Sequence, residues 1–403
     1  MPTVNPKILE WARETAAFTL EDAARKLGIN ESRGVSAINR LLALESGVDI
    51  PSRPMLVKMA KQYRRPLLVF YMSSPPPIGD RGKDFRTLPA GYSLAENALL
   101  DALIRDVRAR QSMIRSALEI EDEGEKIPFV GSMRLSDGVN AVVKAIQNTL
   151  NASVADFQAQ DTPELAFAWL REKVEAAGVF VLLIGNLGSH HTSIDIEIFR
   201  GFALADEVAP FVVINDQDSK AAWSFTLLHE VAHLWLGQSG VSGGRLDATI
   251  EQFCNEVAGH FLLPTDELQK LKINDGADFD TITTRISAFA QERNLSSSMV
   301  AYRLHRAGII RFDTWSQLSN AFRDQWINWR RQNRERARNQ DGGPNYFVIR
   351  RHRVGTALIR LVRRMVETGT LATTKAGTVL GVKPKNVQAL IDLGRVPDVS
   401  RLV

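Results

Sequence analysis

Two histidines enclose a glutamate in the segment AAWSFTLLHEVAHLWLG, at positions His229, Glu230 and His233. On a helix, residues four apart face nearly the same direction, so both imidazoles can reach one ion. Zinc accepts two neutral histidine nitrogens, and the glutamate between them can take a proton from an attacking water. A coincidental pair of helix histidines is the alternative, but the surrounding residues are apolar and indicate a buried helix. The pattern therefore predicts a zinc site with Glu230 as the general base.

A zinc site in a hydrolase needs a third protein ligand, and the next predicted helix, TIEQFCNEVAGHFLLP, offers two glutamates. On this helix Asn255 lies about 40° from Glu251, whereas Glu256 lies about 140° away and His260 about 180° away. We therefore expect Glu251 to be the third ligand, with Asn255 on the same face to orient a ligand histidine. Cys254 is expected to be a small buried core residue and not a thiolate ligand.

Short apolar segments before the histidine helix predict a small β-sheet. The segment 179–185 is continuously apolar, 193–199 alternates between polar and apolar residues, and 209–216 ends in turn residues. A sheet edge beside a zinc site could hold an extended peptide as a further strand. This arrangement favours a peptide substrate over a small molecule.

Helical patterns account for most of the remaining chain. Asn5 followed by Pro6 predicts a capped helix start, and Thr19 with Asp22 predicts a second helix that ends at Gly28. We expect an α+β, mostly helical fold, with further helices at roughly 93–118, 137–150, 163–177, 221–237 and 249–263, and helical structure from about 312 onward.

The length of 403 residues is enough for two or three domains. We expect a helix-turn-helix-like domain at 1–78, a helical linker region at 79–150, a metallopeptidase domain at 151–312 and a basic helical region at 313–403. The chain has one cysteine, and no apolar stretch is long enough to cross a bilayer. These features predict a cytoplasmic protein with no membrane partner.

The net charge of +4 conceals an uneven distribution. Residues 303–403 contain 20 Lys/Arg and 7 Asp/Glu, a balance of +13, whereas the rest of the chain has 30 and 39, a balance of −9. Such a basic end could bind a nucleic acid or dock against the acidic part of the same chain. The basic residues that could do so are Arg330, Arg331, Arg334, Arg336, Arg338, Arg350, Arg351 and Arg353, followed by Lys383 and Lys385 in two short helices expected around Gly381.

Together these segments resemble the ImmA/IrrE-type metallo-endopeptidases that carry an N-terminal helix-turn-helix. The resemblance rests on FTLLHEVAHLWLG and EQFCNEVAGHFLLP, with NLSSSMVAYRLHRAGII after them and TLEDAARKLGI near the N-terminus. It implies a zincin-like, gluzincin-type core in which His229, His233 and Glu251 bind Zn²⁺ and Glu230 is the general base. In the helix-turn-helix, the segment NESRGVSAINRLLAL holds about two extra helical turns, so the second helix is expected to be lengthened or repositioned.

Two functions follow from these patterns. The resemblance implies an endopeptidase that cleaves a regulatory protein, typically a helix-turn-helix repressor, in a stress, mobile-element or toxin–antitoxin-like system. The alternative is a DNA-binding transcriptional regulator or antitoxin-like protein that uses the zinc fold as a scaffold and contacts DNA through its N-terminal or basic C-terminal region. Retention of Glu230 favours hydrolysis, because a scaffold would not need a general base.

Overall fold

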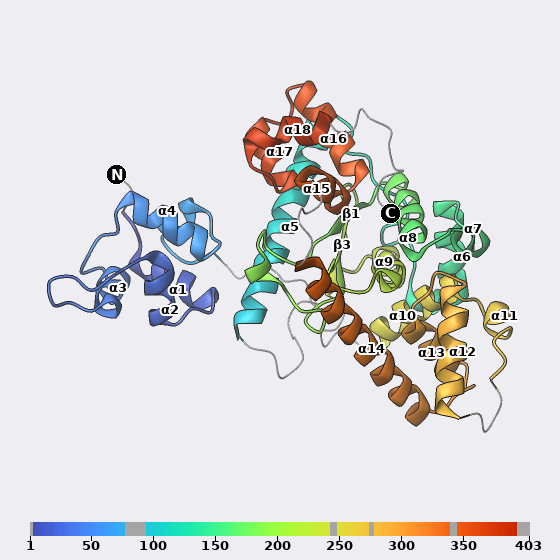
Figure 1. Cartoon of the computed structure of the whole chain (residues 1–403). Coiled ribbons are helices and arrows are strands. Elements are labelled where there is room, and N and C mark those ends of the chain that lie inside the picture. The colour runs from blue at the N-terminus through green and yellow to red at the C-terminus, as the bar shows by residue number, and fades with distance from the viewer. Residues whose placement is uncertain (1–2, 77–93, 242–247, 274–277, 339–344, 393–403) are drawn as a thin grey trace. The chain divides into compact units, whose positions relative to one another are not determined.

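The computed structural model describes residues 3–76, 94–241, 248–273, 278–338 and 345–392 (Figure 1). The chain divides into two compact units, one formed by Met1–Asp106 with Asn186–Ile194 and the other by Val107–Gly185 with Asp195–Val403. In the described part, no helix is both long enough and apolar enough to span a membrane.

The first unit contains a cluster of short helices around its own apolar core. The predicted helix starts are confirmed, because the side chains of Asn5 and Thr19 accept hydrogen bonds from the backbone amides of Lys7 and Asp22. A buried ion pair joins Arg13 to Glu45 at 2.8 Å. The helices are α1 (Pro6–Thr15), α2 (Leu20–Leu27), α3 (Ala37–Glu45) and α4 (Arg53–Gln62), followed by the 3-10 helix η1 (Leu67–Tyr71).

The extra residues after α2 form a separate turn, and the next helix, α3, has nine residues. Gly28 ends α2 in the left-handed conformation, with a φ of +69°. A backbone bridge between Ser32 and Val35 then forms a separate turn before α3 begins at Ala37. The exposed face of α3 carries Leu42. A DNA-reading helix-turn-helix in this unit stays a prediction.

The second unit contains a four-stranded sheet of order β1-β3-β2-β4. Its strands are β1 (Phe180–Leu183), β2 (Gly201–Leu204), β3 (Phe211–Ile214) and β4 (Gly240–Val241). β1 and β3 are parallel and fully buried, which explains why both are continuously apolar in sequence. β2 runs antiparallel to both β3 and β4, with Gly201 opposite Ile214.

The prediction of a strand at 193–199 is wrong. The nearest strand, β2, begins at Gly201. Asp195 forms a local turn, in which its side chain accepts a hydrogen bond from the amide of Glu197 and its carbonyl accepts one from Ile198. These local bonds replace the ladder that a strand would need. Ile194, Ile196 and Ile198 are nevertheless buried, so the alternation correctly predicted burial and not backbone pairing.

Helices surround the sheet and share one large apolar core. In Figure 1, α9 and α10 lie side by side, and they also pack together in the contact pattern. The helices of this part are α5 (Leu94–Ile120), α6 (Val139–Leu150), α7 (Val154–Gln158), α8 (Pro163–Ala176), α9 (Lys220–Trp235), α10 (Ala248–Leu262), α11 (Thr265–Leu268), α12 (Phe279–Gln291), α13 (Ser297–Arg306) and α14 (Phe312–Arg338).

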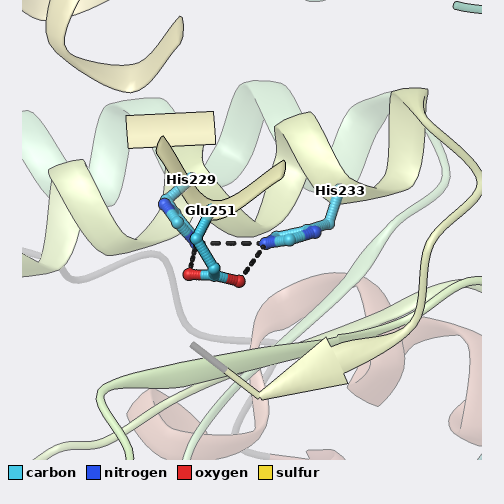
Figure 2. A group of neighbouring side chains, drawn as sticks. All are labelled: His229, His233 and Glu251. Atoms are coloured by element: carbon cyan, nitrogen blue, oxygen red, sulfur yellow. Dashed lines mark hydrogen bonds and ion pairs between the residues drawn. The ribbon is translucent and has the colours of Figure 1, made fainter. Parts of the chain in front are cut away.

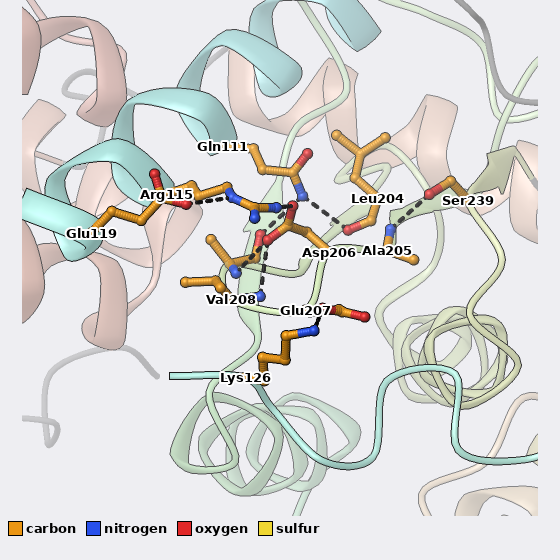
Figure 3. Close-up of polar contacts among 11 residues, drawn as sticks. Gln111, Arg115, Glu119, Lys126, Leu204, Ala205, Asp206, Glu207, Val208 and Ser239 are labelled. Atoms are coloured by element: carbon orange, nitrogen blue, oxygen red, sulfur yellow. Dashed lines mark hydrogen bonds and ion pairs between the residues drawn. The ribbon is translucent and has the colours of Figure 1, made fainter. Parts of the chain in front are cut away.

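The hairpin between β2 and β3 is fixed by the C-terminal half of α5 (Figure 3). The amide of Gln111 donates to the carbonyls of Leu204 and Ala209 at 3.0 and 2.9 Å. Arg115 pairs with Asp206 at 2.6 Å, and the same carboxylate caps the turn by accepting from two backbone amides. The end of β2 is therefore held by Gln111 and Arg115 of α5, which belong to the segment expected to be a linker region.

The C-terminal helices are α15 (Tyr346–Val354), α16 (Thr356–Glu367), α17 (Thr373–Leu380) and α18 (Val387–Asp392), with the 3-10 helix η4 (Pro384–Asn386) before α18. They attach to α8 through Arg171 and Glu175, which form a buried ion pair at 2.9 Å. Arg171 also donates to the carbonyl of His352, and Glu175 accepts from Thr356. Residues 107–150 of the expected linker region fall in the same unit as 313–403 and most of 151–312. The domain boundaries expected from the sequence stay a prediction.

Candidate metal centre

The helix α9 places three polar side chains in the interior of the second unit. Most of its other side chains from Trp223 to Trp235 are apolar and buried, which is the pattern of a helix enclosed by the core. His229 is 3%, Glu230 0% and His233 1% exposed. Burial of three ionisable groups on one helix is costly unless they share a charged ligand or pair with one another. These residues therefore need a chemical explanation.

Glu251 of α10 reaches both histidines, as predicted (Figure 2). The Nε2 atoms of His229 and His233 lie 3.1 Å apart. They lie 3.3 and 3.2 Å from the two carboxylate oxygens of Glu251. A tetrahedral ion with bonds of about 2.0–2.1 Å holds its ligand atoms about 3.3–3.4 Å apart. One ligand atom from each of the three side chains lies within 4.8 Å of the other two, so together they could hold one metal ion.

The ionisation states also suit a cation. Burial favours the neutral form of His233 and lowers its pKa. Burial alone would raise the pKa of Glu251, but hydrogen bonds from both histidines lower it to about 2. For His229, the nearby Glu251 and Glu230 outweigh burial and raise the pKa. A metal bound to His229 would compete with its proton, because metal binding and protonation use the same nitrogen.

Asn255 lies next to His229, on the face of α10 that also carries Glu251. Its side chain is among the groups that raise the pKa of His229. This position agrees with the expected role of Asn255 in orienting that imidazole, a role that stays a prediction. The Nδ1 atoms of His229 and His233 have no hydrogen-bond partner within the described residues.

The other glutamate of α10 has a different role. Glu256 points to α13, where it accepts a hydrogen bond from Tyr302 at 3.2 Å and pairs with Arg303 at 3.3 Å and with Arg306. His260 lies 3.5 Å from the same carboxylate. Glu256 and His260 therefore hold α10 against α13 and do not reach the histidines of α9.

Cys254 is fully buried, and burial raises the pKa of its thiol. A protonated thiol is a poor metal ligand, which agrees with the expected core role. Within the described part of the chain, His229, His233 and Glu251 form the only cluster of three or more His, Cys, Asp or Glu side chains that could hold a metal ion.

Sequence reasoning missed Gly201, the first residue of β2. A methyl group on this glycine would lie 2.8 Å from Oε1 of Glu230. The signal in the sequence was a glycine directly before an apolar segment, which often marks a close approach of backbone to another group. The incorrect strand at 193–199 concealed it, because it placed Gly201 in a loop.

Comparison with known families locates this site in a recognised domain. Residues 184–305 match the family model of the IrrE N-terminal-like domain, a peptidase family. The match supports an ImmA/IrrE-type metallopeptidase domain in this segment. The matched range includes α9 and α10 with all four proposed site residues, and it ends within α13. No curated protein and no solved structure matches the chain.

The metallopeptidase domain implies a metal cofactor, and the geometry of His229, His233 and Glu251 fits one. The two imidazole nitrogens lie 3.1 Å apart, and each lies 3.2–3.3 Å from one oxygen of the Glu251 carboxylate. Glu251 is the most exposed of the three, with 16% of its side chain accessible. Solvent therefore reaches the group from the side of Glu251.

Proposed function

We propose that the chain is a zinc-dependent endopeptidase that cleaves a regulatory protein partner, with a helix-turn-helix repressor as the preferred substrate class. The observation that carries this proposal is the convergence of His229, His233 and Glu251 on one point, with the fully buried Glu230 on the same helix as the histidines. A donor set of two imidazoles and one carboxylate with a fourth position open is the set of a catalytic zinc site. An oxygen-preferring ion such as Mg²⁺ would not select two histidines.

In this proposal, His229, His233 and Glu251 hold the ion. When bound, zinc supplies a Lewis acid for the scissile carbonyl and lowers the pKa of a water molecule. Glu230 accepts the proton from the attacking water and then donates it to the nitrogen of the leaving amine. Burial keeps this carboxylate away from bulk water, so that its proton goes to the substrate.

The sheet supports a peptide as the substrate. β4 is the last strand in the order, and within the described strands it pairs with β2 alone. An extended peptide could add to such an edge through main-chain hydrogen bonds. This edge differs from the one expected from the sequence, because neither β2 nor β4 was among the predicted strands.

Incubation of metal-free and zinc-loaded protein with purified helix-turn-helix repressors tests the proposal. We expect zinc-loaded protein to create new internal N-termini, which mass spectrometry can locate in the repressor sequence. The metal-free protein should create none. Cleavage that does not depend on zinc, or zinc-loaded protein that only trims chain ends, would contradict an endopeptidase.

Nucleic-acid binding is a second candidate, favoured by the helices around Gly381. Lys375, Lys383 and Lys385 are exposed near the turn between α17 and α18, and within the described part of the chain none of them has an ion pair. The two short helices expected there are confirmed. Three lysines around one turn could contact a phosphate backbone.

Docking within the chain accounts for other basic residues of this region. Arg353 pairs with Asp216 at 2.6 Å, and Arg364 pairs with Glu121 at 3.2 Å. Arg330 donates to Gln217, and Arg350 donates to the carbonyl of Leu380. Arg331 and Arg336 of α14 are exposed, whereas the side chains of Arg334 and Arg338 lie outside the described residues. The nucleic-acid candidate therefore rests on the exposed lysines and on Arg331 and Arg336.

A further inference from the structure

The strand β2 presents its smallest residues to the zinc-ligand helix α9. Alternate residues of a strand point to the same face, so Gly201 and Ala203 share one face of β2. Ala203 belongs to the core that includes Leu227 and Val231 of α9. β2 and α9 pack directly against each other. The face that touches α9 is therefore made of a glycine and an alanine.

Gly201 lies against the side chain of Glu230, with no room for a methyl group between them. A Cβ atom at this position would lie 2.8 Å from Oε1 and 3.1 Å from Cγ of Glu230. It would also lie 2.7 Å from Cγ2 of Thr226, one helical turn earlier on α9. These separations are shorter than van der Waals contact, so either the strand or the two side chains would have to move.

The strand cannot easily move away from α9, because its start is held by Asn215. The backbone amide of Asn215 donates to the carbonyl of Arg200 at 2.8 Å, and its side-chain amide donates to the carbonyl of Phe199 at 3.0 Å. Asn215 is fully buried. Arg200 is also joined to Asp218, just before α9, at 3.0 Å. Three bonds therefore hold the backbone directly before Gly201.

We propose that Gly201 is a positioning residue for Glu230: the absence of a side chain at this point of a fixed strand sets where the catalytic carboxylate lies. The inference rests on the proposed function, in which Glu230 is the general base. A methyl group at position 201 displaces the side chain of Glu230, because the backbone before Gly201 is held by Asn215 and the crowded Oε1 and Cγ atoms belong to a side chain with several rotatable bonds. The fold tolerates this displacement, whereas proton transfer requires a carboxylate within hydrogen-bond reach of the water.

The test compares wild type with Gly201→Ala, both loaded with zinc. We expect Gly201→Ala to lower kcat by about 10- to 100-fold, because misplacement by about 1 Å has effects of this size. KM should change by less than about threefold, since substrate binding is not altered. Zinc content and thermal unfolding temperature should stay close to those of wild type. Gly124→Ala is the matched control, because its methyl would crowd another glutamate, with Cγ of Glu119 at 3.2 Å, away from the site.

A double variant separates the two neighbours of the new methyl group. Thr226→Ala removes the contact with Thr226 and leaves the contact with Glu230. If Gly201→Ala acts through Glu230, the loss of kcat persists in the double variant Gly201→Ala/Thr226→Ala. Full recovery of kcat there would overturn the inference, because it would assign the effect to packing against Thr226.

Crystal structures of the zinc-loaded wild type and Gly201→Ala supply a readout that does not depend on activity. We expect the Glu230 carboxylate to move while the backbone of β2 and the side chains of His229, His233 and Glu251 stay in place. An unmoved Glu230 with a shifted β2 would overturn the inference, as would unchanged kcat in Gly201→Ala. Inactive wild-type protein would refute the proposed function, and the crystal structures would still decide the role of Gly201.

Discussion

Two glutamates of α10 differ in the partners that surround them, and this difference separates metal binding from helix packing. Glu251 contacts the two histidines of α9, whereas Glu256 contacts Tyr302, Arg303 and Arg306 of α13. The two carboxylates belong to the same helix and both have a pKa of about 2. Their pKa values therefore do not distinguish them, and only their neighbours do.

Replacing each of these glutamates by glutamine tests the assignment. Glu251→Gln should weaken zinc binding by at least about 100-fold, because it removes the only anionic ligand. Glu256→Gln should leave zinc affinity within about threefold of wild type. Competition with a chromophoric chelator measures both affinities. The assignment would be wrong if Glu256→Gln lost zinc and Glu251→Gln kept it.

The ion pairs of Glu256 also predict how stability depends on pH. Burial alone would raise its pKa, but hydrogen bonds from His260 and Arg306 and the charge of Arg303 hold it at about 2. A carboxyl with a depressed pKa stabilises the fold above its unfolded pKa of about 4.3, and this contribution disappears as the pH falls toward the folded value.

We therefore expect the difference in unfolding free energy between wild type and Glu256→Gln to be largest at neutral pH. It should decrease between about pH 4 and pH 2 as the wild-type carboxyl becomes protonated. Urea unfolding of the metal-free proteins at several pH values measures this difference. A difference that stayed constant or grew toward pH 2 would show that Glu256 does not act through its charge.

At the scale of elements, the contact between α8 and the C-terminal helices depends on a buried ion pair. The side chains of Arg171 and Glu175 are 8% and 5% exposed. Glu175 also accepts hydrogen bonds from Thr356 and from the backbone amide of Ala357 at the start of α16. Removal of Glu175 would leave a buried guanidinium and the first turn of α16 without their acceptor.

Glu175→Ala should therefore reduce the unfolding free energy by about 3–5 kcal/mol, the usual effect of breaking a buried pair from one side. Glu172→Ala, on the exposed face of the same helix, is the matched control and should change it by less than about 0.5 kcal/mol. Urea unfolding followed by tryptophan fluorescence measures both. Equal effects of the two substitutions would contradict a structural role of the pair.

The elements that the sequence predicted well are those with a strong local signal. The helices that carry His229 and Glu251 were predictable because their apolar residues recur with helical spacing, and the angle between Glu251 and Glu256 followed from helix geometry. The strand predicted at 193–199 was wrong because the alternation of polar and apolar residues indicates only which side chains are buried. In the structure, Asp195 accepts hydrogen bonds from the amides of Glu197 and Ile198, which form a turn. Gly201 was missed because the incorrect strand at 193–199 left it outside the predicted sheet, and the side chain that it approaches, Glu230, lies 29 positions later in the sequence.

At the scale of the whole molecule, the basic C-terminal region combines two kinds of residue. Arginines such as Arg353 and Arg364 form ion pairs with acidic residues of the same unit. Lys375, Lys383 and Lys385 are exposed around the turn at Gly381. Docking within the chain thus accounts for part of the positive charge and leaves the lysines for a further partner.

Salt dependence tests whether these lysines contact a nucleic acid. Three phosphate contacts should weaken binding of a labelled DNA duplex by about 40-fold between 50 and 200 mM salt. Lys383→Glu/Lys385→Glu should remove most of this dependence, whereas Lys144→Glu/Lys272→Glu, with the same change of charge at other exposed positions, should retain it. No binding at 50 mM salt, by fluorescence anisotropy, would refute the nucleic-acid candidate.

The most direct test of the whole account is peptide-bond cleavage by wild type and Glu230→Gln at equal zinc content. Glu230 is not one of the proposed zinc ligands. Both proteins should therefore bind one zinc ion, as determined by elemental analysis. We predict that zinc-loaded wild type cleaves a helix-turn-helix repressor and that Glu230→Gln is slower by at least about 100-fold, because an amide cannot accept the proton of the attacking water. Equal cleavage by the two proteins, with zinc bound in both, would contradict the account.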